Sequence, residues 1–178
     1  MKFKDFEERL VAFKSFTNND EKGIFDKLRM WGYFSAPAST KYHLAYEGGL
    51  FEHSINVAVA LIELTYANGL KWQRKESPVY IGLLHDLCKC DQYIKDGDIY
   101  KFNPNMSLVG HGDKSATLAK KLLDITEEEE ACIINHMGAF DEKDKWARYT
   151  NAIHKFPNVL WTHTADMIAS HIVEERKE

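Results

Sequence analysis

The sequence predicts an all-α fold, namely a single domain (residues 1–178) of seven or eight helices with one small β-hairpin near residues 93–100. Three observations lead to this prediction. Apolar residues recur mostly at three- and four-residue spacings, which is the period of one helix face. Glycine, proline and hydroxyl side chains stand where such segments would begin or end. One short aromatic and β-branched stretch surrounds an Asp-Gly pair, which is a hairpin signal.

Residues 1–32 are expected to form two scaffold helices. Aromatic and leucine side chains recur at a near-helical period over residues 2–16, and a second helix is expected to run to about Trp31 and to be closed by Gly32. The candidate N-cap residues of this second helix are Thr17, Asn18, Asn19 and Asp20.

An irregular segment over residues 33–47 leads into the next helix. Gly48 and Gly49 permit a sharp turn directly before that helix, which is expected over about 50–67. His53 lies in its first turn, on the apolar face, and therefore points inward. A lone inward histidine is usually a hydrogen-bonded core residue, so its partners decide its role.

The helix after that one is expected to begin with Ser77 as N-cap and Pro78 as first helical residue, and to carry His85 and Asp86. Adjacent helical residues point about 100° apart, so this pair can flank a metal cluster, with the imidazole on one ion and the carboxylate reaching a second. A buried, hydrogen-bonded His-Asp pair is the alternative interpretation. Lys89 is expected on the same helix face, where an ammonium suits a phosphate.

Two further helices each place a histidine near one end. His111 stands at or just before the start of an amphipathic segment over 115–123, and Thr126 is the N-cap candidate of the helix that continues to His136. The charged segment 141–149 is ambiguous, and a solvated surface is the favoured interpretation of it.

The last helix is expected from about 157 to 175 and contains Asp166 among apolar neighbours. A carboxylate in such surroundings needs a partner. His163 lies one turn before Asp166 and could orient it. No role is evident for His154 or His171.

The composition describes an ordinary globular protein, with 44% hydrophobic and 28% charged residues. The net charge of −4 argues against a broadly basic nucleic-acid binder. Three cysteines form no paired framework, so a reducing cytoplasm is expected. Cys88 and Cys132 are interpreted as small core residues. No apolar run approaches the ~20 residues of a membrane span, and no contact with a membrane is expected.

Six polar side chains, on five predicted segments, stand out because each lies at a helix end or within an apolar face. Four imidazoles and two carboxylates can hold two borderline divalent ions, with one carboxylate as a bridge. Coincidence could explain any one of these residues but not the set. They are His53, His85, Asp86, His111, His136 and Asp166.

Their order, H…HD…H…H…D, resembles the HD-domain superfamily of metal-dependent phosphohydrolases, and in particular its dinuclear members. The resemblance covers roughly residues 36–171, which would form the metal-binding HD core. The segment with Pro37-Ala38-Ser39 and His43 is similar to the HD domain of certain bacterial 3′→5′ exoribonucleases and of prophage-encoded relatives. The most specific pieces are Gly48-Gly49-Leu50-Phe51-Glu52-His53-Ser54 and Leu84-His85-Asp86-Leu87-Cys88-Lys89, with Thr164-Ala165-Asp166-Met167 as a weaker third.

The resemblance implies a dinuclear centre in which Asp86 bridges two metals. A water between two such ions becomes hydroxide at neutral pH and serves as the nucleophile. Iron or manganese is expected at both positions. Nickel, cobalt and zinc are alternatives, and magnesium is a further alternative at one position. By position, one metal would be held by His53, His85 and Asp166, and the other by His111 and His136.

Lys89 would bind a phosphate oxygen and offset charge in the transition state, so that Asp86 and Lys89 are the predicted catalytic residues. The expected substrate is a small phosphorylated compound such as a nucleotide, with the end of a single-stranded nucleic acid as an alternative. The walls of its pocket are expected from 33–47, 91–105 and 139–150. The candidates for substrate contact are His43, Lys114 and Arg148.

Two other functions use the same residues. Some dinuclear HD proteins are oxygenases with a mixed-valent di-iron centre, and oxygen dependence with iron would separate them from a hydrolase. A non-catalytic nucleotide-binding module is the third interpretation. The complete ligand set favours hydrolysis over this last one. The sequence indicates neither the substrate nor the oligomeric state.

Overall fold

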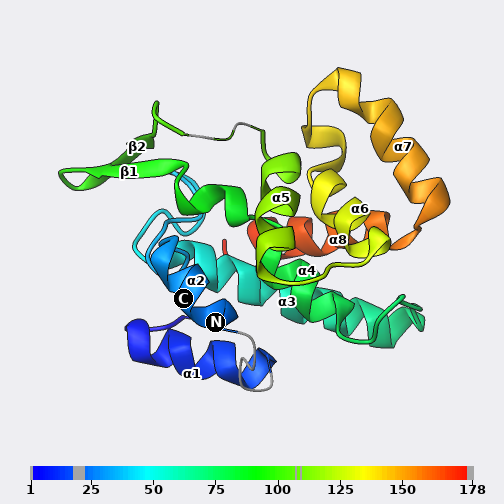
Figure 1. Cartoon of the computed structure of the whole chain (residues 1–178), viewed down its shortest axis with the longest axis horizontal. Coiled ribbons are helices and arrows are strands. Elements are labelled where there is room, and N and C mark those ends of the chain that lie inside the picture. Colours follow the sequence, from blue (N-terminus) through cyan, green and yellow to red (C-terminus); the bar gives the residue numbers. More distant parts are fainter. Residues whose placement is uncertain (1, 18–22, 107, 109, 176–178) are drawn as a thin grey trace.

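The computed structural model describes residues 2–17, 23–106, 108 and 110–175. Within these ranges the chain forms eight α-helices and one two-stranded antiparallel sheet, so the predicted all-α fold with a small hairpin is confirmed (Figure 1). The helices are α1 (Phe6–Thr17), α2 (Ile24–Met30), α3 (Gly49–Asn68), α4 (Ser77–Leu84), α5 (Gly112–Leu122), α6 (Glu127–Asn135), α7 (Trp146–Lys155) and α8 (Asn158–Ile168).

The remaining elements are short. The strands are β1 (Tyr93–Asp96) and β2 (Ile99–Phe102), and the pairing of Asp96 with Ile99 makes Gly97 and Asp98 the turn residues. Single helical turns join the longer elements: the 3₁₀ turns η1 (Leu87–Cys90), η2 (Gly138–Phe140) and η3 (Lys143–Lys145), and the π-turn η4 (Ala169–Val173).

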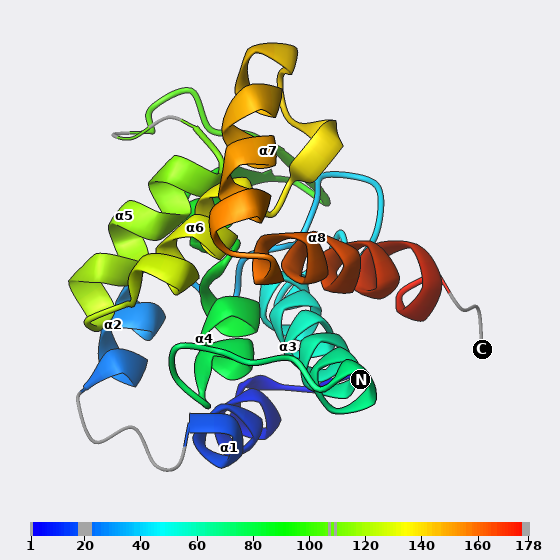
Figure 2. The same cartoon turned by 90° about the vertical axis from the view of Figure 1, so that its right-hand side faces the viewer.

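Helix α3 is the central element. It packs against α4 on one side and against α8 and η4 on another (Figure 2). A Cβ atom at Gly82 of α4 would lie 2.4 Å from the Cα of Ala58 of α3, so only glycine permits this close crossing. At the start of α3, Gly48 has a φ of 86°, which confirms the expected turn before the helix.

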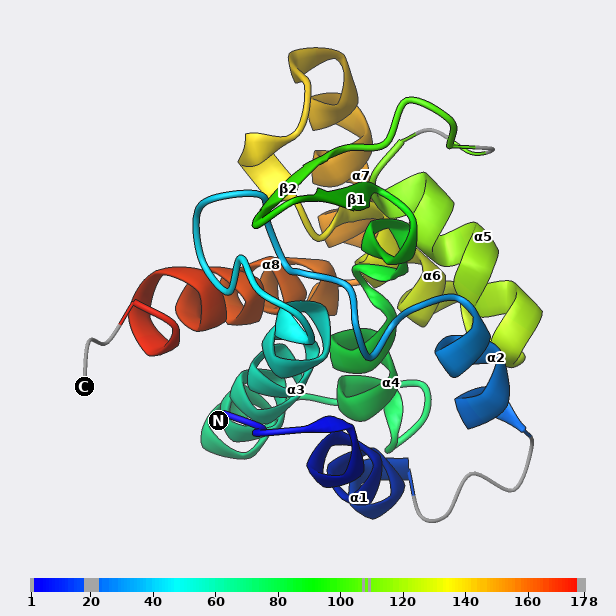
Figure 3. The same ribbon diagram turned by 90° about the vertical axis from the view of Figure 1, so that its left-hand side faces the viewer.

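The N-terminal helices pack on this core through aromatic side chains. The buried rings of Phe13 and Phe34 meet edge to face at 5.5 Å. Arg9 is also buried and donates to the carbonyls of Phe34 at 2.8 Å and Glu47 at 3.2 Å, which ties α1 to the segment before α3. Figure 3 shows α1 at one end of the molecule and α7 at the other.

Several elements have bounds that differ from the expected ones. Helix α4 ends at Leu84, so His85 and Asp86 do not share a helix as predicted; Asp86 has φ −110° and ψ 22°, outside the helical range. The predicted helix over 157–175 is α-helical to Ile168 and then continues as the π-turn. The ambiguous segment 141–149 contains η3 and the start of α7. Of the four N-cap candidates for the second helix, Thr17 is instead the last residue of α1, and Asn18, Asn19 and Asp20 lie outside the described residues.

None of the helices in the described ranges is long and apolar enough to cross a membrane.

Candidate metal centre

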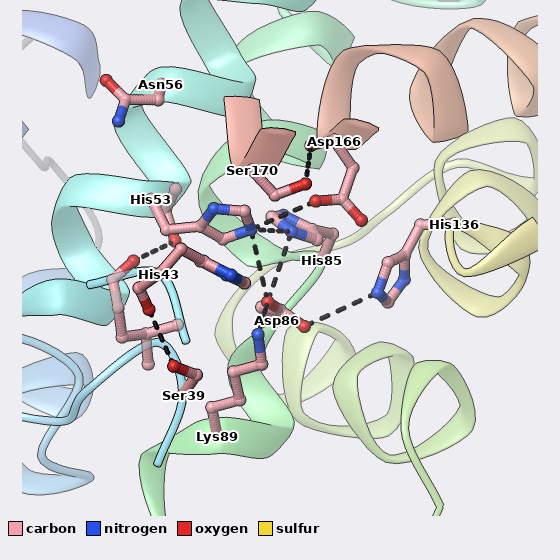
Figure 4. Close-up of polar contacts among 12 residues, drawn as sticks. Ser39, His43, His53, Asn56, His85, Asp86, Lys89, His136, Asp166 and Ser170 are labelled. Carbon is pink, nitrogen blue, oxygen red and sulfur yellow. Dashed lines mark hydrogen bonds and ion pairs between the residues drawn. The ribbon is translucent and has the colours of Figure 1, made fainter. Parts of the chain in front are cut away.

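The structure brings together all six residues that the sequence singled out. Most of them stand at helix ends: His85 and His136 directly follow the last residues of α4 and α6, and His111 directly precedes α5. His53 lies in α3 and Asp166 in α8 (Figure 4). Because five separate elements converge here, the tertiary packing sets the spacing of the side chains.

Asp86 lies at the centre of the cluster, and its two oxygens face different sets of groups. Oδ2 lies 3.5 Å from His53 Nε2, 3.5 Å from His85 Nε2 and 2.6 Å from Lys89 Nζ. Oδ1 lies 2.8 Å from His111 Nε2 and 3.5 Å from His136 Nε2. Each oxygen of Asp86 thus faces its own pair of imidazoles, so this carboxylate could contact two cations at once.

Asp166 completes the group around Oδ2. Its Oδ1 lies 3.3 Å from His53 Nε2, and the Nε2 atoms of His53 and His85 are 3.3 Å apart. We call this group the first position, made of His53, His85, Asp166 and Asp86 Oδ2. The second position is made of His111, His136 and Asp86 Oδ1.

Hydrogen bonds at the other ring nitrogen set the tautomers of two histidines. His85 Nδ1 lies 2.9 Å from the Gly82 carbonyl, and His136 Nδ1 lies 2.7 Å from the Ile133 carbonyl. A carbonyl only accepts, so each Nδ1 carries the hydrogen, and in the neutral ring the Nε2 lone pair faces the cluster. His136 Nε2 is buried and has no hydrogen-bond partner in the described part of the chain, as expected of an atom that needs a ligand.

His53 has a carboxylate on its outer nitrogen. Its Nδ1 lies 2.9 Å from Oε1 of Glu174, which also accepts from Asn56 Nδ2 at 3.1 Å. A carboxylate in this place orients a metal-binding imidazole and strengthens it as a donor. Glu174 reaches His53 because the π-turn, closed by the bond from Glu174 N to the Ala169 carbonyl at 3.0 Å, adds a residue to the last helical turn.

His111 is supported differently. Its Nδ1 lies 3.3 Å from Sγ of Cys88, a buried thiol whose pKa is raised to about 12 by burial. Cys88 is thus a protonated neighbour of the cluster at neutral pH. The sequence interpretation of Cys88 as only a small core residue misses this contact.

The ionisable groups of the cluster shift one another strongly. Burial lowers the pKa of His85 to about 4. Burial also lowers the pKa of His53, but hydrogen bonds to Asp166 and Glu174 outweigh it and raise this pKa to about 10. Burial opposes ionisation of Asp86, yet Lys89, His85 and His111 together hold its pKa well below the usual value. Without a metal, the cluster therefore keeps its carboxylates ionised and a proton on His53.

A cavity of about 1150 Å³ opens onto the cluster. Its walls include residues of all three predicted segments, among them Tyr42 and His43, Tyr93, and Phe140. A fourth wall, from the end of α8 and η4, was not predicted; it contributes Met167, Ser170, His171, Glu174 and Glu175. No sequence signal marked this wall, because its orientation depends on the π-turn.

The three predicted substrate contacts have different environments. His43 lines the cavity beside His53, with ring centroids 5.2 Å apart. Lys114 is buried in an ion pair with Asp91, and Arg148 pairs with Asp113 at 2.9 Å; neither is among the residues that line this cavity. His163, expected to orient Asp166, lies with Nδ1 2.8 Å from the His136 carbonyl.

Several three-residue groups within the cluster could hold a metal ion, since one ligand atom from each member lies within 4.8 Å of the others. The sequence matches no protein-family model, and comparisons with curated proteins and with solved structures find no match either. The interpretation of the site therefore depends on its own chemistry. The groups are His53–His85–Asp86, His85–His136–Asp166, Asp86–Cys88–His111 and His43–His53–Glu174.

Proposed function

We propose that this protein is a metal-dependent phosphohydrolase of the HD type that acts on a nucleotide-like phosphoester or phosphoanhydride. The observation that carries the proposal is the division of Asp86: one oxygen faces two imidazoles of the first position, and the other faces two imidazoles of the second. Such a donor set fits two divalent transition-metal ions, with iron or manganese as the expected metals.

Two ions held in this way would polarise a phosphoryl oxygen and lower the pKa of a bound water. The residues of the chain do the remaining work. Asp86 fixes the spacing of the two positions, and the outer hydrogen bonds of His53, His85 and His136 hold their rings toward it. No serine or cysteine nucleophile is needed, and the buried Cys88 thiol is poorly suited to that role because burial raises its pKa.

Lys89 is the group that favours a phosphate. Its ammonium is buried, lies 2.6 Å from Asp86 Oδ2 and lines the cavity. Burial lowers its pKa, but Asp86 outweighs this and keeps the pKa above the ordinary lysine value, so the charge persists at neutral pH. A fixed cation beside the cluster can bind a phosphoryl oxygen and stabilise charge that develops there.

The cavity supports a small substrate. Its volume of about 1150 Å³ is slightly above the roughly 300–1,000 Å³ that small-molecule sites occupy, which is enough to accommodate a nucleotide. The charge distribution also disfavours a long nucleic acid, because two of the three predicted basic contacts, Lys114 and Arg148, are paired with carboxylates.

The test is phosphate release from a panel of nucleoside mono-, di- and triphosphates by protein loaded with Mn²⁺ under anaerobic conditions. Asp86→Asn should abolish release, and His154→Ala, an exposed change in α7, should leave it unaltered. No release by the metal-loaded wild type would contradict the proposal. Substrate-dependent oxygen consumption by iron-loaded protein would instead identify a di-iron oxygenase.

A further inference from the structure

Two buried polar atoms beside the first position lack partners in the described part of the chain. They are Oε2 of Glu174, whose side chain is 1% exposed, and Nε2 of His43. They lie 3.9 Å apart, and both residues line the cavity. Figure 4 shows His43 beside His53, on the opposite side of the cluster from His136.

The distance is too long for a direct hydrogen bond. An oxygen placed about 2.8 Å from each atom would see the two at an angle of roughly 90°, which suits the bond directions of a hydroxyl group. A buried carboxylate oxygen without a donor is costly, so this pair of atoms points to a ligand that hydrogen-bonds to both.

The two atoms restrict what can bind between them. Glu174 already uses Oε1 for His53 and Asn56, so Oε2 is the oxygen left for a ligand, and as a carboxylate oxygen it accepts but cannot donate. The Nε2 of His43 can donate one. A hydroxyl group both donates and accepts and satisfies the two atoms at once. A phosphoryl oxygen only accepts, so the carboxylate would repel it toward Lys89.

We propose that His43 and Glu174 form a subsite for a ribose hydroxyl of the substrate, next to the position where its phosphate binds. The rings of His43 and His53 lie 5.2 Å apart, so the subsite is within the span of one nucleotide from the first position. This inference rests on the proposed function and narrows it, because it selects ribonucleotides over nucleotides that lack the sugar hydroxyls.

The test compares the binding of two ligands that cannot be hydrolysed. They are the 5′-methylenephosphonate analogues of adenosine monophosphate and of 2′,3′-dideoxyadenosine monophosphate, titrated calorimetrically into the full chain loaded with Mn²⁺. Loss of the hydroxyls leaves a buried carboxylate oxygen without its donor, so the dideoxy analogue should bind about tenfold to a hundredfold more weakly. The 2′-deoxy and 3′-deoxy analogues would then show which hydroxyl is bound.

Two variants locate the preference. His43→Ala and Glu174→Gln should each bring the two affinities to within about threefold, and Gln keeps an oxygen as acceptor for His53 Nδ1. His154→Ala and Glu63→Gln, matched changes at exposed positions, should retain the wild-type ratio. The ratio is taken within one protein, so a change in metal content affects both ligands alike. Thermal unfolding identifies any variant that fails to fold.

Three results would overturn the inference: equal binding of both analogues by the wild type, binding of neither, or a preference that survives in both variants. The proposed function is tested separately, by phosphate release from the natural esters. Hydrolysis without a hydroxyl preference would leave the phosphohydrolase proposal intact. A preference in binding without hydrolysis would support the subsite and contradict the proposed function.

Discussion

The two positions that share Asp86 differ in the burial of their histidines and in the group that contacts the outer ring nitrogen. The first position contains His53 and His85, which are fully enclosed, and a buried carboxylate backs His53. At the second position the side chain of His111 is 23% exposed and is backed by a thiol. Carboxylate support strengthens an imidazole donor more than a neutral thiol does.

The difference indicates a division of work. The first position offers three candidate ligands besides Asp86, and the second offers two. We therefore expect the first position to hold its metal permanently and the second to exchange metal with solvent and to present it to the substrate.

The largest effect is expected for the residue that both positions share. Asp86→Asn removes the bridging charge, so both positions should lose metal and phosphate release should fall by about a thousandfold or more. Metal analysis and steady-state kinetics measure the two losses. Asp144→Asn, an exposed change in η3, is the control. Retention of two metals by the Asp86 variant would show that this carboxylate is not the bridge.

The second prediction compares one ligand from each position. Metal content should fall from about two ions per chain to about one in His111→Ala, whose remaining ion resists the chelator. His85→Ala should lose the tightly held ion and, on dialysis, the exchangeable one as well. Elemental analysis after dialysis against a weak chelator separates the outcomes. Equal losses in the two variants would contradict the contrast. One ion in both the wild type and His111→Ala would leave a mononuclear site.

Lys89 should affect rate but not metal occupancy. Lys89→Met removes a buried cation that faces the cavity, and kcat should fall about a hundredfold to a thousandfold while the metal content stays near the wild-type value. Lys89→Arg, which keeps the charge, should recover part of the rate. If the Met variant loses metal, Lys89 stabilises the cluster through Asp86 and does not act on the substrate.

The smallest effect concerns protons. The pKa of His53 is raised to about 10, so His53 carries a proton at neutral pH in the metal-free protein and must release it when metal binds. Apparent affinity at the first position should therefore rise by up to about tenfold per pH unit as pH increases from 7 to 9. His85, whose pKa is lowered to about 4, adds no proton in this range.

Glu174→Gln gives the matching comparison for this titration. It weakens one of the hydrogen bonds that raise the pKa of His53, so the rise in affinity should shift to lower pH. Calorimetry in buffers of different ionisation enthalpy counts the protons released. A flat pH dependence in the wild type would mean that His53 is neutral before metal binds.

The sequence was most informative where local chemistry repeats. Helical periods predicted the all-α fold, the double glycine predicted the turn before α3, and Thr126 accepts from Glu129 N at 3.2 Å as the expected N-cap of α6. The six polar residues of the cluster could be selected because each stood in an apolar or helix-end setting. The selection is possible because burying a polar side chain costs free energy, and apolar neighbours in the sequence indicate that the side chain is buried.

Other features depend on contacts between distant segments. His53 and Glu174 are 121 positions apart, and they meet only because the π-turn redirects the end of α8. The chain leaves the helical conformation at Asp86, which lets the two carboxylate oxygens face different groups. No local sequence signal predicts this change either. The ion pairs that hold Lys114 and Arg148 bring together segments that are 23 and 35 positions apart.

The sequence by itself determined which residue types can bind metal and near which helices they lie, because side-chain chemistry and helix periodicity are local properties. Only the tertiary structure decided which nitrogen of each imidazole faces Asp86 and which carboxylate backs His53. The close crossing at Gly82, where α4 meets Ala58 of α3, illustrates the reason. The relative positions of these side chains are set by packing between helices, and packing is a property of the whole chain.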